Sequence, residues 1–173
     1  MYMKKCFVVV MVFSFITSFL LANSLELGSP APQLTVLTDQ GTAFDLGDAL
    51  STGTTLVFFY PKAMTPGCVK QACSLRDGWD ELQARKVSIF GVSSDTAKTQ
   101  AQFRDKYTLP FTLLADTDGQ IADAFSKSRW SRQAYIFKDG ILVWRDLKAA
   151  TSEQATEILA ALDELEPNTQ VSN

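Results

Sequence analysis

TTLVFFYPKAMTPGCVKQAC, residues 54–73, contains the signals of a strand and of a helix start in immediate succession. Its apolar run at 56–60 is typical of a central β-strand buried on both faces. Pro61 ends this strand, and Pro66-Gly67 predicts a helix start because proline is favoured in the first helical turn. Cys68 is therefore expected in the first turn of a helix that directly follows a buried strand.

Strand and helix patterns alternate along the rest of the chain. The helix that starts at Pro66 is expected to continue to about Arg85. Asp95 is the expected cap of a later helix, and Thr151 and Gln154 have the spacing of a capping box for the last one. The remaining predicted elements are strands at 87–92 and 111–115, helices at 95–107 and 121–125, and hairpins formed by 34–37 with 43–46 and by 134–137 with 141–145.

This order predicts an α/β fold in three layers. Strands joined by helices pair in parallel, whereas the late hairpin is antiparallel, so the central sheet is mixed. The pattern resembles a thioredoxin-like sheet with an N-terminal β-hairpin, although the pattern alone leaves other three-layer folds open. We expect one domain over residues 25–167 and a polar C-terminal tail at 168–173.

Residues 1–24 differ from the rest of the chain. The first five residues carry two lysines and no acid, and residues 6–22 carry no charge. A basic start, an apolar stretch and small residues at its end predict a signal peptide, and therefore export, in bacteria to the periplasm. Cleavage is expected after Ala22 or Ser24, with no stable membrane association afterwards. The alternative is a retained membrane anchor, because about 17 apolar residues approach the length that spans a bilayer.

The composition of the remaining chain excludes several functions. Without Lys4 and Lys5, 14 basic residues stand beside 19 acidic ones, and no basic cluster remains, so nucleic acid is not an expected partner. The sequence contains no histidine, which rules out histidine-based zinc sites, Cys-His pairs and Ser-His-Asp triads. No metal or cofactor is expected.

Cys68 and Cys73 are the cysteines that would remain after signal removal. Their even number in an exported domain suits a structural disulfide, which is the plain alternative to a reactive pair. The unpaired backbone N–H groups and the positive dipole end of the first helical turn favour the thiolate of Cys68, which is the nucleophilic form. Thr65, three residues earlier, is a candidate to place its hydroxyl beside this sulfur.

The spacing Pro61-x-x-x-Thr65-x-x-Cys68 resembles the signature of peroxiredoxins. The longer run that ends at Cys73 is similar to the bacterioferritin-comigratory or peroxiredoxin Q subgroup. Arg132, three residues before Tyr-Ile-Phe, matches the active-site arginine of that family. Further similarity extends over residues 28–32, 90–95 and 109–116.

The resemblance implies roles for these residues. Cys68 would be the peroxidatic cysteine and Cys73 the resolving one, while Thr65 and Arg132 would hold the peroxide and Pro61 would shield the pocket. Gln71 occupies the position where many peroxiredoxins place an acid or amide beside the arginine. The segment between Asp116 and Arg132 is shorter than is usual in the subgroup, and it leaves Arg129 as a rival for the role of the arginine.

The implied activity is a thiol-dependent peroxidase acting on hydrogen peroxide and organic hydroperoxides. The sulfenic acid of Cys68 would be resolved by Cys73 as an intrachain disulfide and recycled by a thioredoxin-like or other external dithiol donor. Such a pair needs no partner subunit, so we expect a monomer. The alternatives are an exported thiol–disulfide oxidoreductase, against which the C-x4-C spacing argues, and a non-catalytic, redox-locked binding domain.

The disulfide between these cysteines requires a change of backbone. On an ideal helix, residues five apart have Cα atoms about 8.6 Å from each other. A disulfide tolerates a Cα separation of at most about 7 Å. The reduced protein is therefore expected to be helical over both cysteines, and the oxidised protein locally unwound.

Overall fold

A mixed β-sheet forms the centre of the fold of this computed structural model, which describes residues 25–128 and 130–166. The strands of the sheet are β1 (Thr35–Thr38), β2 (Ala43–Asp45), β3 (Thr54–Phe59), β4 (Val87–Ser93), β5 (Thr112–Ala115), β6 (Gln133–Lys138) and β7 (Ile141–Asp146). Their order in the sheet is β2-β1-β5-β4-β3-β6-β7. The pairs β3–β4 and β4–β5 are parallel and the others antiparallel, so the predicted mixed sheet and both hairpins are confirmed.

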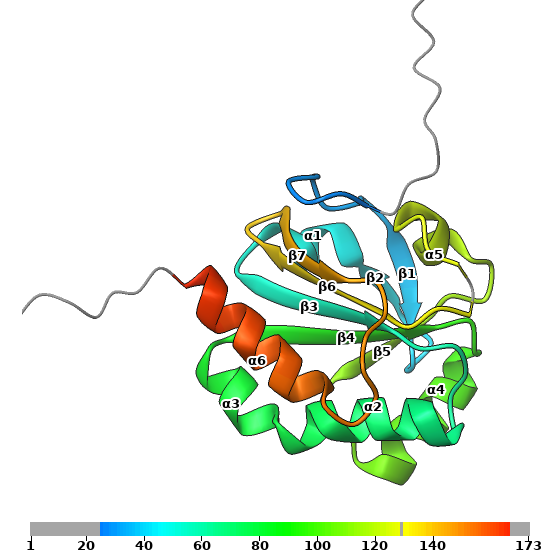
Figure 1. The fold of residues 1–173 in the computed structure, drawn as a ribbon. Helices are drawn as coiled ribbons and strands as arrows, with labels where there is room; N and C mark the ends of the chain where they lie inside the picture. The colour runs from blue at the N-terminus through cyan, green and yellow to red at the C-terminus, as the bar shows by residue number, and fades with distance from the viewer. Residues whose placement is uncertain (1–24, 129, 167–173) are drawn as a thin grey trace, which may run out of the picture.

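Helices cover both faces of this sheet. They are α1 (Leu46–Ser51), α2 (Pro66–Asp77), α3 (Trp79–Ala84), α4 (Ala97–Tyr107), α5 (Gln120–Ala124) and α6 (Gln154–Leu165). Figure 1 shows α2, α3, α4 and α6 on one side of the sheet, and α1 and α5 on the other. The buried side chains form two clusters with the same division, and the three predicted layers are confirmed.

Strand β3 explains why its sequence is a continuous apolar run. Side chains of a strand point alternately to opposite faces of the sheet. Leu56 and Phe58 pack into the cluster under α2 and α6, whereas Val57 and Phe59 pack into the cluster under α1 and α5. All four are at most 1% exposed. Hydrogen-bonded neighbours on both sides and cores on both faces fix this strand firmly.

The helix predicted at 66–85 is two helices, α2 and α3, which are interrupted at Gly78. The backbone N–H of Gly78 caps α2 by donating to the carbonyl oxygen of Ser74 at 3.0 Å. Packing explains the glycine: a Cβ atom at this position would lie 2.7 Å from the Cβ of Ala155 in α6. The apolar periodicity continued through the break, which is why the sequence pattern indicated one helix.

Two predicted helix caps are wrong. Thr96, and not Asp95, caps α4, because its side chain accepts from the backbone N–H of Thr99. Asp95 instead accepts from the backbone N–H of Ala63 at 2.7 Å, in the loop that precedes α2. The cap of α6 is also not at Thr151: the cap residue is Glu153, without a side-chain hydrogen bond.

One short helix has no counterpart in the sequence prediction. The second strand of the N-terminal hairpin was expected to reach Leu46, but the chain turns into α1 there. Asp45 makes this possible, since its carboxylate accepts from the backbone N–H of Asp48 at 2.9 Å and caps the helix.

Three predictions concern residues outside those that the structure describes: the signal peptide at 1–24, the rival arginine Arg129 and the polar tail at 168–173. Within the described ranges, no helix is both long and apolar enough to cross a bilayer.

Candidate active site

The loop between β3 and α2 makes a sharp turn. Half-buried Pro61 begins the turn, and Met64 adopts a left-handed conformation with φ of 64°. Thr65 is extended, as expected of a residue that precedes proline, and Pro66 begins the helix. Cys68 therefore lies in the first turn of α2, as predicted from its spacing.

Cys68 and Arg132 come together although they are far apart in sequence. The side chain of Cys68 is fully buried, and the Nη1 atom of Arg132 donates to its sulfur at 3.2 Å. The sheet explains the contact: Phe59 pairs with Gln133, so the residues that follow β3 and precede β6 leave the sheet at the same end. The contact therefore brings a permanently charged guanidinium against the sulfur.

Gln71 is the second partner of Arg132. Its Oε1 atom accepts from the same Nη1 at 3.2 Å, and its side chain is fully buried. Its Nε2 atom donates to Oε1 of Gln154 at 2.8 Å and to the carbonyl oxygen of Phe59 at 3.5 Å. Gln154 was predicted as part of a capping box, and its place in the site was missed because no local pattern links α6 to α2.

Thr65 is close in sequence to Cys68, but its hydroxyl has another partner. Its Oγ1 atom donates to the carbonyl oxygen of Lys62 at 2.9 Å. Among the described residues, no hydrogen bond joins this hydroxyl to the Cys68 sulfur. Its oxygen keeps lone pairs that can accept from a ligand in the site.

Gly67 is a site residue that the sequence analysis missed. A Cβ atom at this position would lie 2.7 Å from the Nη2 atom of Arg132. The absence of a side chain therefore leaves the space that the guanidinium occupies. A glycine in the first turn of a helix was the signal that could have indicated a close approach of this kind.

Cys73 lies in the same helix as Cys68. Both are free thiols, and the side chain of Cys73 is half buried. Arg76 lies close to Cys73 along α2, and its hydrogen bond to Asp77 raises the pKa of its guanidinium. The thiol-containing form thus has an unbroken helix over both cysteines, as was expected of the reduced protein.

The phenol of Tyr60 lies directly before Pro61 in sequence and is fully buried. Burial raises its pKa far above the ordinary range, and it donates a short hydrogen bond to Gln100. Tyr60 is therefore neutral at physiological pH and supports the loop as part of the core.

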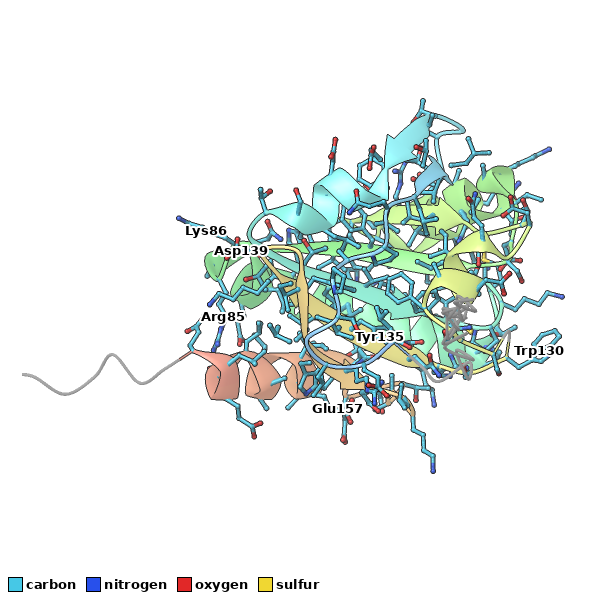
Figure 2. The ribbon with its side chains drawn as sticks, turned by 90° about the horizontal axis from the view of Figure 1, so that it is seen from above. Arg85, Lys86, Trp130, Tyr135, Asp139 and Glu157 are labelled. Atoms are coloured by element: carbon cyan, nitrogen blue, oxygen red, sulfur yellow. The ribbon has the colours of Figure 1, made fainter. Side chains whose placement is uncertain are left out.

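The segment before Arg132 combines exposed and half-buried side chains. Trp130 is 69% exposed and stands at the margin of the molecule, at the opposite end of β6 from the turn at Asp139 (Figure 2). The ammonium group of Lys127 lies 5.1 Å from the ring centroid of Phe59, and burial lowers its pKa to about 8. The described residues contain no group of three or more side chains suited to hold a metal ion.

Comparisons with known proteins agree on one family. The model of the AhpC/TSA family matches residues 27–145. Peroxiredoxin Bcp of Escherichia coli (strain K12) is 40% identical over 121 residues, which cover 69% of this chain and 76% of that protein. A putative peroxiredoxin bcp of Haemophilus influenzae is 41% identical over 121 residues, with the same shares of both chains.

Solved structures give the same result. Peroxidoxin BcpB of Mycobacterium tuberculosis superposes with a TM-score of 0.75 and 28% identity, covering 83% of this chain and 99% of that one. A mutant of peroxiredoxin Q of Xanthomonas campestris superposes with a TM-score of 0.72 and 26% identity, covering 77% and 92%. The chain therefore belongs to the AhpC/TSA family as a peroxiredoxin of the Bcp and peroxiredoxin Q type, a thiol-dependent peroxidase.

Proposed function

We propose that this protein reduces hydrogen peroxide and organic hydroperoxides through a sulfenic acid on Cys68, which Cys73 converts to an intrachain disulfide. The observation that supports this proposal best is the 3.2 Å contact between Nη1 of Arg132 and the Cys68 sulfur. The contact places a fixed positive charge at a nucleophile that lies in the first turn of a helix. No histidine exists in the chain to activate the thiol instead.

In the first step, the Cys68 thiolate attacks one peroxide oxygen. The S–O bond forms as the O–O bond breaks, so the sulfur is oxidised to a sulfenic acid. The other oxygen leaves with the electron pair and takes a proton to give water or an alcohol. Arg132 donates to the oxygens as negative charge develops on them. The oxygen of Thr65 accepts from the hydroperoxide O–H, and Pro61 limits access of water.

In the second step, Cys73 attacks the sulfenic sulfur as a thiolate. The S–S bond forms and the oxygen leaves as hydroxide, which is protonated to water. The ideal-helix separation of about 8.6 Å between the two Cα atoms exceeds the disulfide limit. The start of α2 must therefore unwind between Cys68 and Cys73 at this step and refold after reduction.

In the third step, an external dithiol donor reduces the disulfide and becomes a disulfide itself. A thioredoxin-like protein is the donor class that matches this exchange. The donor thiolate attacks one of the two sulfurs, and its second thiol releases both cysteines. No cofactor takes part in the cycle.

The test is peroxide consumption by two single variants. Cys68→Ser should abolish it, whereas Cys73→Ser should still consume about one equivalent per chain, because the sulfenic acid forms but is not resolved. Mass spectrometry should find the Cys68–Cys73 disulfide only in the peroxide-treated wild type.

Other outcomes of this test would contradict the proposal. Exchange with protein disulfides that needs no peroxide would favour a thiol–disulfide oxidoreductase. Absence of peroxide consumption in the wild type and in both variants would favour a non-catalytic domain locked by a disulfide.

We also propose that residues 1–24 direct export to a bacterial periplasm, where the protein acts as a monomer. The basic start and the uncharged run at 6–22 support export, and the intrachain pairing supports a monomer. N-terminal sequencing of the protein from a periplasmic fraction should begin at Asn23 or Leu25. An uncleaved protein in the membrane fraction would contradict export, and a stable dimer in sedimentation would contradict the monomer.

A further inference from the structure

Two buried glutamines from different helices meet behind the active-site arginine. Gln71 of α2 and Gln154 of α6 are both 0% exposed. They form a chain of hydrogen bonds in which Nε2 of Gln71 donates to Oε1 of Gln154 at 2.8 Å, and Nη1 of Arg132 donates to Oε1 of Gln71 at 3.2 Å. The same Nη1 atom contacts the Cys68 sulfur, so the chain of contacts runs from α6 to the nucleophile.

The amide of Gln71 has a donor end and an acceptor end, and its orientation matters. With its oxygen toward Arg132 it accepts from the guanidinium, which has only donors. In the flipped orientation two donors would face each other, and the guanidinium would be pushed from its place. The other acceptor for Nε2, the carbonyl oxygen of Phe59, lies at 3.5 Å, at the weak limit of a hydrogen bond. Gln154 is thus the partner that fixes the orientation.

Only one end of the Gln154 amide is used. Its Nε2 atom is buried and has no hydrogen-bond partner among the described residues. An orphaned buried donor is costly, and an apolar side chain of similar shape would avoid the cost. A glutamine here is therefore explained by its oxygen, which serves Gln71.

A second bond links the same helices. The backbone N–H of Ala155 donates to Oγ of Ser74 at 3.1 Å, and α6 has no side-chain cap of its own. Both bonds from α6 thus end on residues of α2 that lie within, or directly after, the segment between the two cysteines. Unwinding of this segment breaks the bond to Gln71.

We propose that Gln154 is a positioning residue that holds Gln71, and through it Arg132, in the arrangement that reacts with peroxide. The hydrogen bond between Gln154 and Gln71 also stabilises the helical form of the start of α2. This bond breaks when the disulfide forms. Gln154 therefore accelerates the first step and slows the second. This inference rests on the first two steps of the proposed reaction.

The test compares Gln154→Met and Gln154→Glu by stopped-flow measurement of both steps. Gln154→Met keeps the size and loses the acceptor, so the reaction with peroxide should slow about tenfold while disulfide formation becomes several-fold faster. Gln154→Glu keeps an acceptor in either protonation state, so both rates should stay within about threefold of the wild type. Ile158→Val, a change in the core of the same helix, controls for loosened packing and should change neither rate.

Each departure from this pattern overturns the inference. If Gln154→Met leaves both rates unchanged while the wild type turns over, the proposed reaction stands and the role of Gln154 does not. If Gln154→Glu is as slow as Gln154→Met, or if Ile158→Val behaves like Gln154→Met, the effect is structural. A wild type that forms no Cys68–Cys73 disulfide with peroxide would instead refute the proposed function itself.

Discussion

Strand β3 and helix α2 follow each other in the chain but are held in opposite ways. Strand β3 is paired along its whole length with β4 on one side and β6 on the other, and both of its faces are buried. The first half of α2 has no such pairing: it buries Cys68 and Gln71, and side-chain bonds from Arg132 and Gln154 join it to other segments. The sheet therefore fixes the position of the sulfur in the helical form, whereas the proposed disulfide step requires the start of the helix that carries it to unwind.

The difference teaches which substitutions affect stability and which affect chemistry. Changes in β3 remove core packing and should act on the free energy of unfolding. Changes around the start of α2 alter single bonds, each worth about 0.5–1.5 kcal/mol to stability, and should act on rates. The following predictions test this division.

Phe58→Ala should have the largest effect. Phe58 is 0% exposed and contacts Phe111 edge-on with ring centroids 5.6 Å apart, so its removal leaves a cavity. The free energy of unfolding should fall by about 3–5 kcal/mol, as measured by urea denaturation. Ser88→Ala, at an exposed position of β4, is the control. A loss below about 1 kcal/mol would show that the strand is not the rigid base of the site.

Arg132→Lys should leave stability nearly unchanged and slow the reaction with peroxide by about 10²-fold. Lysine keeps the charge but lacks the planar guanidinium, whose Nη1 atom donates to both Cys68 and Gln71. The measurement is the second-order rate constant from stopped-flow fluorescence, with Arg76→Lys as the matched control. If the rate constant falls by less than about threefold, Arg132 does not stabilise the transition state as proposed.

Gly67→Ala should change the rate of reaction with peroxide without lowering the stability of the fold. Alanine is a better helix former, so the free energy of unfolding should stay equal or rise by up to about 1 kcal/mol. The new Cβ atom would lie 2.7 Å from Nη2 of Arg132, whose flexible end must move away, so the peroxide rate should fall about tenfold. Lys70→Ala, exposed on the same helix, should change neither. An unaltered rate for Gly67→Ala would mean that the guanidinium adapts without loss.

Lys127→Met should have the smallest effect, visible in the pH dependence of stability. Burial lowers the pKa of Lys127 from 10.5 to about 8 in the folded protein. Between these values the unfolded state binds more protons, so the contribution of Lys127 to stability rises with pH through this window. The free energy of unfolding of both proteins is measured by urea denaturation at pH 7.5 and 9.5. Relative to the wild type, the variant should be less stable at pH 9.5 than at pH 7.5, by on the order of 1 kcal/mol. A difference that is independent of pH would contradict the lowered pKa.

Sequence patterns predicted the local features well. The buried strand at 54–59 and the helix start at Pro66 follow from composition and proline placement over a few neighbouring residues. The strand pairing at both hairpins followed from turn residues. These features depend on short-range sterics and hydrophobic burial, which a single segment already contains.

The missed features depend on contacts between distant segments. In the sequence, Gln154 has the spacing of a helix cap. Its bond to Gln71, 83 residues earlier, exists only because α6 packs against α2 in the fold. Gly67 and Gly78 are explained by atoms of Arg132 and Ala155 that approach them in space. Thr65 shows the opposite case, since its spacing suggested a contact with the sulfur and its hydroxyl bonds to the carbonyl oxygen of Lys62.

The contact between Cys68 and Arg132 spans 64 residues of sequence, and β6 must pair with β3 to form it. Non-local pairings of this kind form late in folding, after the closure entropy of the intervening loop has been overcome. A chain emerging from the ribosome therefore carries Cys68 without its guanidinium until the last hairpin has joined the sheet. If Arg132 acts in the reaction as proposed, an unfinished chain lacks the group that assists the attack of Cys68 on peroxide.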